Sequence, residues 1–127
     1  MLLHFPIGLI LAALLAEIIA AFSRKPTLRT ASTFCYSLGV VAAVPAAAFG
    51  WLLAANSNIR ETALEWHRWL GVSVAVLGVL TLHTFHSKPR WRLPILCLLA
   101  TLVSGAAHLG GELSYGDDWL DWPTDQR

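Results

Sequence analysis

The sequence has few charged residues and only two cysteines, neither of them in a metal-binding or haem-attachment motif. Of its 127 residues, 13% are charged and 56% are hydrophobic. A soluble domain of this size needs more charge to cover its surface, so the composition predicts a membrane protein. Its two cysteines, Cys35 and Cys97, lie inside apolar stretches, and the sequence contains no CxxCH or CxxC motif. Covalent haem attachment and a CxxC zinc site are therefore excluded, and we interpret both cysteines as buried thiols.

Four long apolar runs make up most of the chain. They cover about residues 2–22, 33–55, 66–86 and 92–110. Each is near the roughly 20 residues that cross a bilayer core, and short polar segments containing Pro26 and Pro89 separate them. The expected fold is all-α, an integral membrane bundle of four helices that run up, down, up and down. It should occupy residues 1–111 and be followed by an acidic C-terminal tail, residues 112–127.

Basic residues gather in the first and third loops. These residues are Arg24, Lys25, Arg29, Lys88, Arg90 and Arg92. The tail is acidic, with carboxylates at Glu112, Asp117, Asp118, Asp121 and Asp125. The positive-inside rule therefore places both basic loops in the cytoplasm and both termini outside. For a bacterial protein, this predicts a multi-pass inner-membrane protein with periplasmic termini.

A repeated pattern links the first and third spans. Residues 4–29 align with residues 67–92 without a gap. The alignment pairs His4 with His67, Gly8 with Gly71, Phe22 with Phe85, Lys25 with Lys88, Pro26 with Pro89 and Arg29 with Arg92. This register predicts that the bundle is a duplicated helical hairpin.

The repeated histidines suggest a cofactor. Spans one and three run in the same direction and are diagonal neighbours in such a bundle, so His4 and His67 are expected to face each other near the outer surface. Gly8 and Gly71 lie one turn below on the same faces and would clear the space between the helices. Two opposed imidazoles above a cleared gap are what a six-coordinate haem requires. The pattern predicts one b-type haem with His4 and His67 as its axial ligands.

Other residues at the same end leave alternatives open. His108 could replace either ligand, and Arg60 and Arg68 are candidate partners for the haem propionates. The histidines could instead form a transition-metal site, for example for copper, or serve only as interfacial hydrogen-bonding residues.

The cytoplasmic half has polar residues of its own, Glu17, His83 and His86. They would suit a proton relay or a quinone pocket. On an ideal helix Glu17 points away from His4, which suggests that it faces a neighbouring subunit.

Several stretches resemble a bacterial family of small four-helix membrane proteins whose function is unknown. They are LHFPIGLILAALLAE, FGWLLAA, WHRWLGVSVAVL and HLGGELSYG. In the resemblance, the HFPI histidine is His4, the third-helix histidine is His67, and the closing motif supplies Gly110, Gly111, Leu113, Tyr115 and Gly116. Relatives of this kind often occur with c-type cytochrome domains, so the resemblance implies redox work.

Together these features predict an electron-transfer subunit of a larger redox complex. It would pass electrons between a quinone pool or redox enzyme and a periplasmic c-type cytochrome. The sequence shows no nucleophile motif, oxyanion loop or phosphate-binding loop, so we expect an electron carrier rather than an enzyme acting by itself, and no nucleic-acid partner. The alternative is a cofactor-free membrane anchor or assembly subunit.

Overall fold

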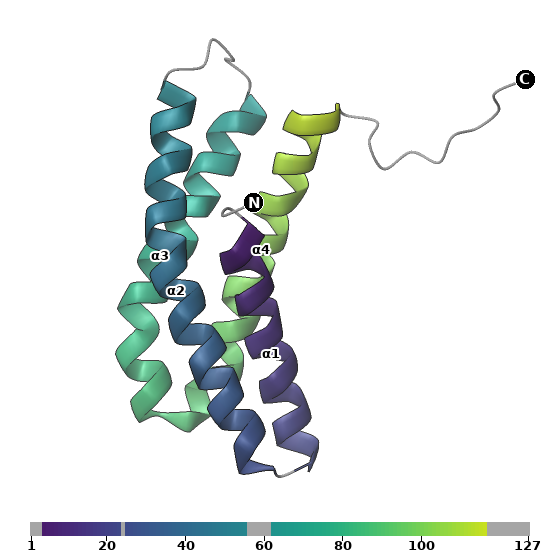
Figure 1. Ribbon diagram of the computed structural model, residues 1–127, viewed down its shortest axis with the longest axis vertical. Coiled ribbons are helices and arrows are strands. Elements are labelled where there is room, and N and C mark those ends of the chain that lie inside the picture. Colours follow the sequence, from purple (N-terminus) through teal and green to yellow (C-terminus); the bar gives the residue numbers. More distant parts are fainter. Residues whose placement is uncertain (1–3, 24, 56–61, 117–127) are drawn as a thin grey trace, which may run out of the picture.

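The computed structural model describes residues 4–23, 25–55 and 62–116. Its helices are α1 (Phe5–Ser23), α2 (Pro26–Ala55), α3 (Thr62–Ser87), the short 3-10 helix η2 (Pro89–Trp91) and α4 (Arg92–Tyr115) (Figure 1). The four long helices are each long and apolar enough to cross a membrane, and the described residues form no strand. The prediction of an all-α membrane bundle is confirmed.

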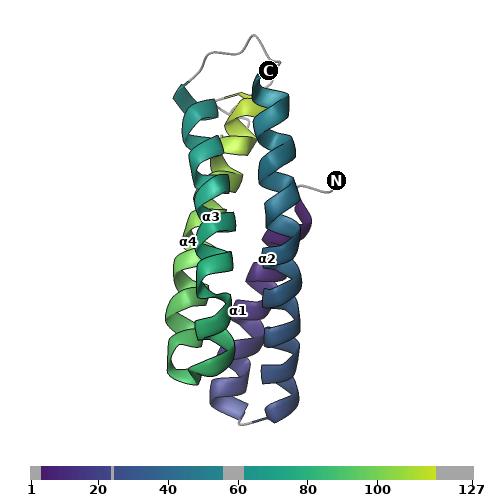
Figure 2. The ribbon, with the colours of Figure 1, turned by 90° about the vertical axis from the view of Figure 1, so that its left-hand side faces the viewer.

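The four long helices form an antiparallel bundle in which helices that follow one another in the sequence are neighbours, and α4 closes the bundle beside α1. α1 and α3 each lie beside both α2 and α4, whereas the backbones of the diagonal pairs do not approach one another closely in the described part of the chain (Figures 1 and 2). We call the end where α2 ends and α3 begins the upper end. The end with the α1–α2 and α3–α4 connections is the lower end. α1 begins below the upper ends of the other three helices, so the uppermost part of the bundle is formed by α2, α3 and α4 (Figures 1 and 2).

The helices extend beyond the apolar runs that predict them. α2 begins at Pro26 and not near residue 33, and α4 continues to Tyr115. Pro26 and Pro89 each begin a helix, because a proline at the first helical position lacks only an N–H that would be unpaired there anyway. Polar residues at the membrane surface can continue a helix, so hydropathy alone underestimates its length.

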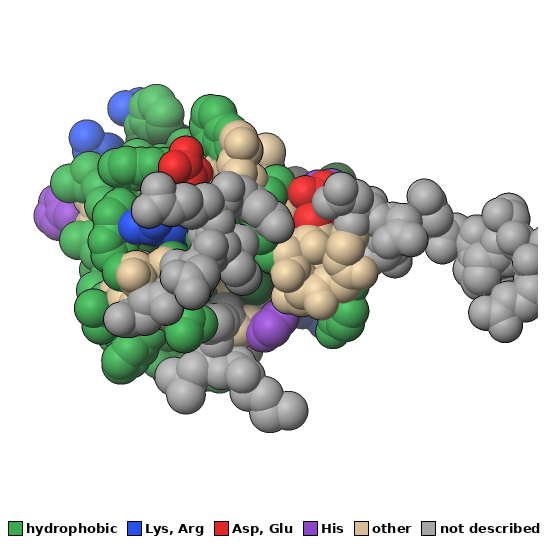
Figure 3. Space-filling view, turned by 90° about the horizontal axis from the view of Figure 1, so that it is seen from above, with side chains coloured by type: hydrophobic (Ala, Val, Ile, Leu, Met, Phe, Trp, Pro, Cys, Tyr) green, Lys and Arg blue, Asp and Glu red, His purple; other side chains and the backbone are tan. Residues whose placement is uncertain are grey.

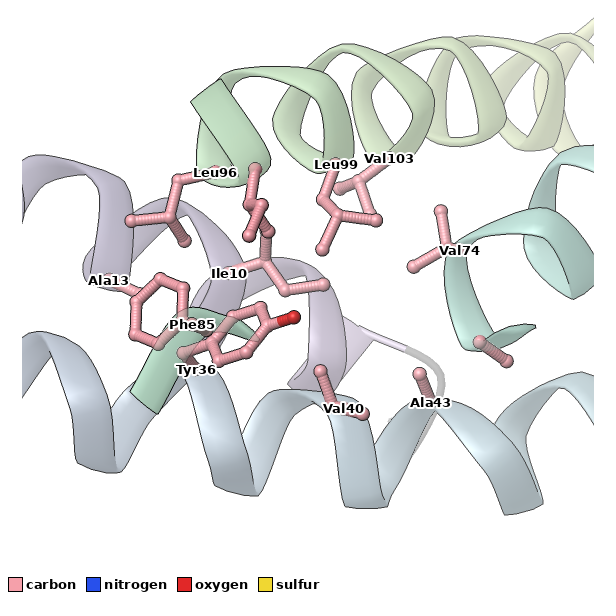
Figure 4. Packing of buried hydrophobic residues seen from close by; sticks show 12 residues of the cluster. Ile10, Ala13, Tyr36, Val40, Ala43, Val74, Phe85, Leu96, Leu99 and Val103 are labelled. Carbon is pink, nitrogen blue, oxygen red and sulfur yellow. The ribbon is translucent and has the colours of Figure 1, made fainter. Parts of the chain in front are cut away.

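The tightly packed core lies in the lower and middle parts of the bundle. Its largest fully buried side chains are Tyr36, Phe85, Ile10, Leu96, Leu99 and Val40 (Figure 4). The Tyr36 and Phe85 rings stack with their centroids 3.9 Å apart. The Tyr36 hydroxyl donates to the Gly78 carbonyl over 3.1 Å and lies 2.8 Å from the Thr81 hydroxyl, so this buried polar group is paired.

Gly78 shows how closely α2 and α3 approach one another. A Cβ atom at this position would lie 2.9 Å from a Val40 methyl carbon, a separation that real Cβ atoms hardly ever show. In lipid, where apolar surfaces gain little by leaving the solvent, such close packing is a main source of helix association.

The outer surface of the bundle is apolar, as expected of a chain surrounded by lipid. Seen from above, hydrophobic side chains form most of the rim of the described part of the molecule (Figure 3). Cys97 belongs to this surface and Cys35 is half-buried, so the interpretation of both as buried thiols was wrong for Cys97. A lipid-facing position suits a small apolar side chain as well as a core position does.

Candidate functional site

His67 lies on the face of α3 that meets the rest of the bundle. The same face carries Gly71, Val74, Gly78 and Phe85, spaced three, four or seven residues apart. Val74, Gly78 and Phe85 are buried, whereas His67 and Gly71 are half-buried. The His67 imidazole therefore points inward near the upper end.

The imidazole of His67 is seated against α4. Its Nδ1 atom lies 2.8 Å from the Ala106 carbonyl oxygen. One turn further along α4, a Cβ atom at Gly110 would lie 3.1 Å from Cε1 of the ring, so glycine leaves the space that the ring occupies. Neither residue was predicted to hold His67, although Gly110 belongs to the HLGG stretch that marks the end of the fourth span.

This hydrogen bond determines which nitrogen of the neutral ring carries the proton. A carbonyl oxygen can only accept, so Nδ1 is the donor and Nε2 carries the free lone pair. Nε2 makes no hydrogen bond with any residue in the described part of the chain. Iron-ligating and zinc-ligating histidines commonly have the same arrangement, in which the second nitrogen donates to a carbonyl and fixes the ring.

Two glycines of the upper half have open space beside their own backbones. Gly71, one turn below His67, and Gly50 on α2 are both half-buried, and a Cβ atom at either would meet no heavy atom within 4 Å. The largest fully buried side chains come from the lower and middle parts of the helices.

His4 lies on the opposite side of its helix from the core. The buried residues of α1 are Pro6, Ile10, Ala13, Glu17 and Ala20. His4 and Gly8 instead begin an exposed stripe that continues through Leu11, Leu15 and Phe22. The expectation that His4 and His67 face each other across the bundle was wrong in this arrangement, because α1 turns the face that carries His4 and Gly8 outward.

His108 also points away from the interior of the bundle. Its side chain is exposed, and its Nε2 lies 3.2 Å from a Glu112 carboxylate oxygen one turn further along α4. His4, His67 and His108 do not come together, and the described residues contain no group of three histidine, cysteine or acidic side chains that could hold a metal ion. The three-histidine copper site therefore has no geometric support.

Of the two arginines predicted to bind the haem propionates, the structure describes only Arg68. Arg60 lies outside the described residues. The guanidinium carbon of Arg68 lies 3.9 Å from the centre of the Trp51 ring, a cation–π contact between α3 and α2. Trp51 also packs edge-on against Trp69, with ring centroids 5.6 Å apart. Arg68 is thus already used in packing, although its buried Nε has no hydrogen-bond partner in the described part of the chain.

Glu17, in the lower half of α1, faces the core and not the outer surface as expected. Glu17 is 7% exposed and lies in the core, where its Oε2 is 4.0 Å from an Arg92 guanidinium nitrogen. Arg92 also donates from Nε to the Phe85 carbonyl over 3.1 Å. The expectation that Glu17 faces a neighbouring subunit was therefore wrong. A charged residue in lipid is stabilised by a partner inside the bundle.

His83 and His86 are exposed near the lower end of α3, and Nε2 of His86 lies 3.3 Å from the Ser37 hydroxyl on α2. Nε2 of His83 lies 3.3 Å from the Ser87 hydroxyl, and Nδ1 of His86 lies 2.8 Å from the Leu82 carbonyl. The aspartates of the acidic tail, from Asp117 onward, lie outside the described residues.

The fold and the matched residues identify the family. A family model described as "Predicted membrane protein (DUF2231)" matches residues 1–119. The chain belongs to the DUF2231 family of predicted membrane proteins. No curated protein and no solved structure matches the chain.

Membership in DUF2231 confirms the resemblance that rested on the HFPI and HLGGELSYG stretches. With the four apolar helices, it makes the chain a multi-pass membrane protein. The family description states no activity. The feature of the chain that bears on function is the site around His67 at the upper end of the bundle.

Proposed function

We propose that the chain is a b-type cytochrome-like membrane subunit that binds one haem at its upper end through His67. The observation that carries this proposal is the hydrogen bond from Nδ1 of His67 to the Ala106 carbonyl. It fixes the ring and leaves the Nε2 lone pair for iron. Gly71 favours the same assignment, because α3 carries no side chain one turn below that ring.

His4 is the better candidate for the second axial ligand. It precedes α1, which begins at Phe5, so its side-chain direction is not set by helical hydrogen bonds on both sides. A change in the first turn could redirect it. His108 lies inside α4 on an outward face, and turning it inward would require rotating a helix that packs against α1 and α3. The proposal therefore requires the start of α1 to turn the His4 side chain inward.

The bound haem would carry electrons between a quinone pool or redox enzyme and a periplasmic c-type cytochrome. The protein's part is to hold the haem, exclude water from it and tune its potential through the axial ligands and the apolar surroundings. The basic lower loops support an orientation in which the lower end is cytoplasmic and the termini are periplasmic in a bacterial inner membrane. The acidic tail would then lie beside the docking side for a basic cytochrome.

Spectroscopy and ligand rescue test the proposal. The purified full chain should show the Soret and α bands of a low-spin b-type haem when it is oxidised and then reduced. His67→Gly should lose these bands and regain them when imidazole is added, because free imidazole can enter the space that the side chain vacates. His83→Gly, the same change on the exposed lower part of α3, is the matched control and should keep the wild-type spectrum.

A second set of variants identifies the other ligand. His4→Ala should convert the spectrum to a high-spin form, whereas His108→Ala should leave it low-spin. The reverse result would move the second ligand to His108. A chain with no haem bands under haem-replete expression would overturn the whole assignment.

The alternative function, a cofactor-free membrane anchor or assembly subunit, is favoured by a different observation. His4 and His108 both point outward, and Arg68 is already held by Trp51. An anchor needs only an apolar outer surface and a stable bundle. Recovery of a pure, folded and colourless chain would support this alternative.

The orientation has its own test. Cysteines introduced at Thr27 and Arg90, in the two basic loops, should resist a membrane-impermeant thiol reagent in intact cells, whereas one at Ser57 should react. The experiment requires a background in which Cys35 and Cys97 are replaced by serine. The opposite labelling pattern would place the haem end in the cytoplasm.

A further inference from the structure

The surface between the lower ends of α1 and α2 is hollowed. The hollow has a volume of about 350 Å³, near the lower limit of ligand pockets, and is lined by Ala20, Ala21, Lys25, Pro26 and Arg29. Two of the five lining residues are cationic and the other three are small or apolar. Alanine and proline side chains let a ligand approach the helix backbone closely, while the lysine and arginine supply positive charge.

The positive charge of the hollow is not used inside the protein. Neither the Lys25 ammonium nor the Arg29 guanidinium forms an ion pair with a residue in the described ranges, and both side chains are exposed. The nearest acidic residue in the sequence, Glu17, pairs with Arg92. Arg92 occupies the position that matches Arg29 in the repeat, so the two arginines have different roles. One balances an internal carboxylate and the other remains available for an external anion.

The depth of the hollow indicates the kind of anion. α1 ends at Ser23 and α2 begins at Pro26, so the hollow lies at the ends of two helices that are each long and apolar enough to cross a membrane. Phe22, next to it in sequence, is 86% exposed on the lipid-facing surface. A ligand held here would have its charged group beside Lys25 and Arg29 and its apolar part along the lower turns of α1.

We propose that this hollow binds the phosphate group of an acidic lipid headgroup. A phosphodiester accepts charge-assisted hydrogen bonds from both the ammonium and the guanidinium group, and basic pockets between membrane helices are suited to such headgroups. The site lies at the opposite end from the proposed haem and does not depend on it. Its role would be to hold a lipid between α1 and α2 at the connection between them.

Spin-labelled lipids test this site in the reconstituted full chain. Electron paramagnetic resonance measures how strongly the protein retains labelled phosphatidylglycerol relative to labelled phosphatidylcholine in phosphatidylcholine vesicles. The double variant Lys25→Gln, Arg29→Gln should lower this selectivity by roughly tenfold, because two cations beside the headgroup are lost. The matched control is Lys88→Gln, Arg90→Gln, which removes the same charge from the other lower loop and should keep most of the selectivity.

Three results would overturn the proposal. The wild type could show no preference for phosphatidylglycerol. The two double variants could lose selectivity equally, and the lower end would then attract acidic lipids by its general charge. Inorganic phosphate at millimolar concentration could displace the labelled lipid where chloride at equal ionic strength does not, which would assign the hollow to soluble phosphate. Selective loss in the first double variant, insensitive to phosphate, is the result we expect.

Discussion

The two copies of the repeated pattern share residues but not environments. In the first copy, His4 and Phe22 point outward and Arg29 lines a surface hollow. In the second copy, His67 and Phe85 point into the bundle. Arg92 also turns inward, toward the buried Glu17. The alignment therefore finds residues that share a helix face, but it does not determine which face is buried.

The membrane explains why the buried face is hard to predict. In water, polar residues mark the outside of a helix, but in lipid both the core and the outer surface are apolar. The buried stripe of α1, with Ile10 and Ala13, and its exposed stripe, with Leu11 and Leu15, are almost equally hydrophobic. The rotation of α1 is thus set by packing detail that a single sequence does not display.

The largest expected difference between the copies concerns the paired phenylalanines. Phe85→Ala should destabilise the bundle by about 3–5 kcal/mol, because the ring is fully buried and stacks on Tyr36. Phe22→Ala, the matched change on the exposed stripe, should change the free energy of unfolding by less than about 0.5 kcal/mol. Equilibrium unfolding in mixed micelles measures both. Equal losses would mean that the two copies are packed alike.

The paired arginines should differ by a smaller amount. Arg92→Gln leaves the buried Glu17 carboxylate without its cation and removes the donor to the Phe85 carbonyl, so we expect a loss of about 2 kcal/mol. Arg29→Gln should leave unfolding unchanged, because its side chain is exposed and forms no ion pair in the described residues. Adding Glu17→Gln to Arg92→Gln should recover much of the loss, since it removes the unpaired charge. A double variant no more stable than Arg92→Gln would show that the ion pair is not the cause.

The paired glycines separate packing from haem binding. A Cβ atom at Gly8 or at Gly71 would meet no heavy atom within 4 Å, so we expect leucine at either position to change the unfolding free energy by at most about 1 kcal/mol. Gly71→Leu should nevertheless abolish haem binding, because it fills the space below His67, whereas Gly8→Leu should retain the haem. Absorbance of the purified variants measures this. Full haem content in Gly71→Leu would place any haem elsewhere.

Most of the fold was predictable, and part of the site was. Long apolar runs and short loops predict four spans, since a bilayer imposes a length that few other environments require. The position of His67 near the upper end follows from its place early in the third apolar run. The hydrogen bond to Ala106 and the seat at Gly110 were not predicted, because they depend on how α3 and α4 are rotated against one another. The charge of Glu17 predicts a protein partner, but it does not tell whether that partner is Arg92 of the same bundle or a neighbouring subunit.

The most direct test of the account is the haem content of the wild type and of His67→Ala. A pyridine haemochrome assay on the purified chains, normalised to protein by amino-acid analysis, gives haem per polypeptide. We expect about one haem in the wild type and in the control His83→Ala, and none in His67→Ala, because only His67 presents a fixed imidazole to the interior. A wild type without haem, or a His67→Ala variant that keeps its full haem content, would show that His67 is not a haem ligand in this protein.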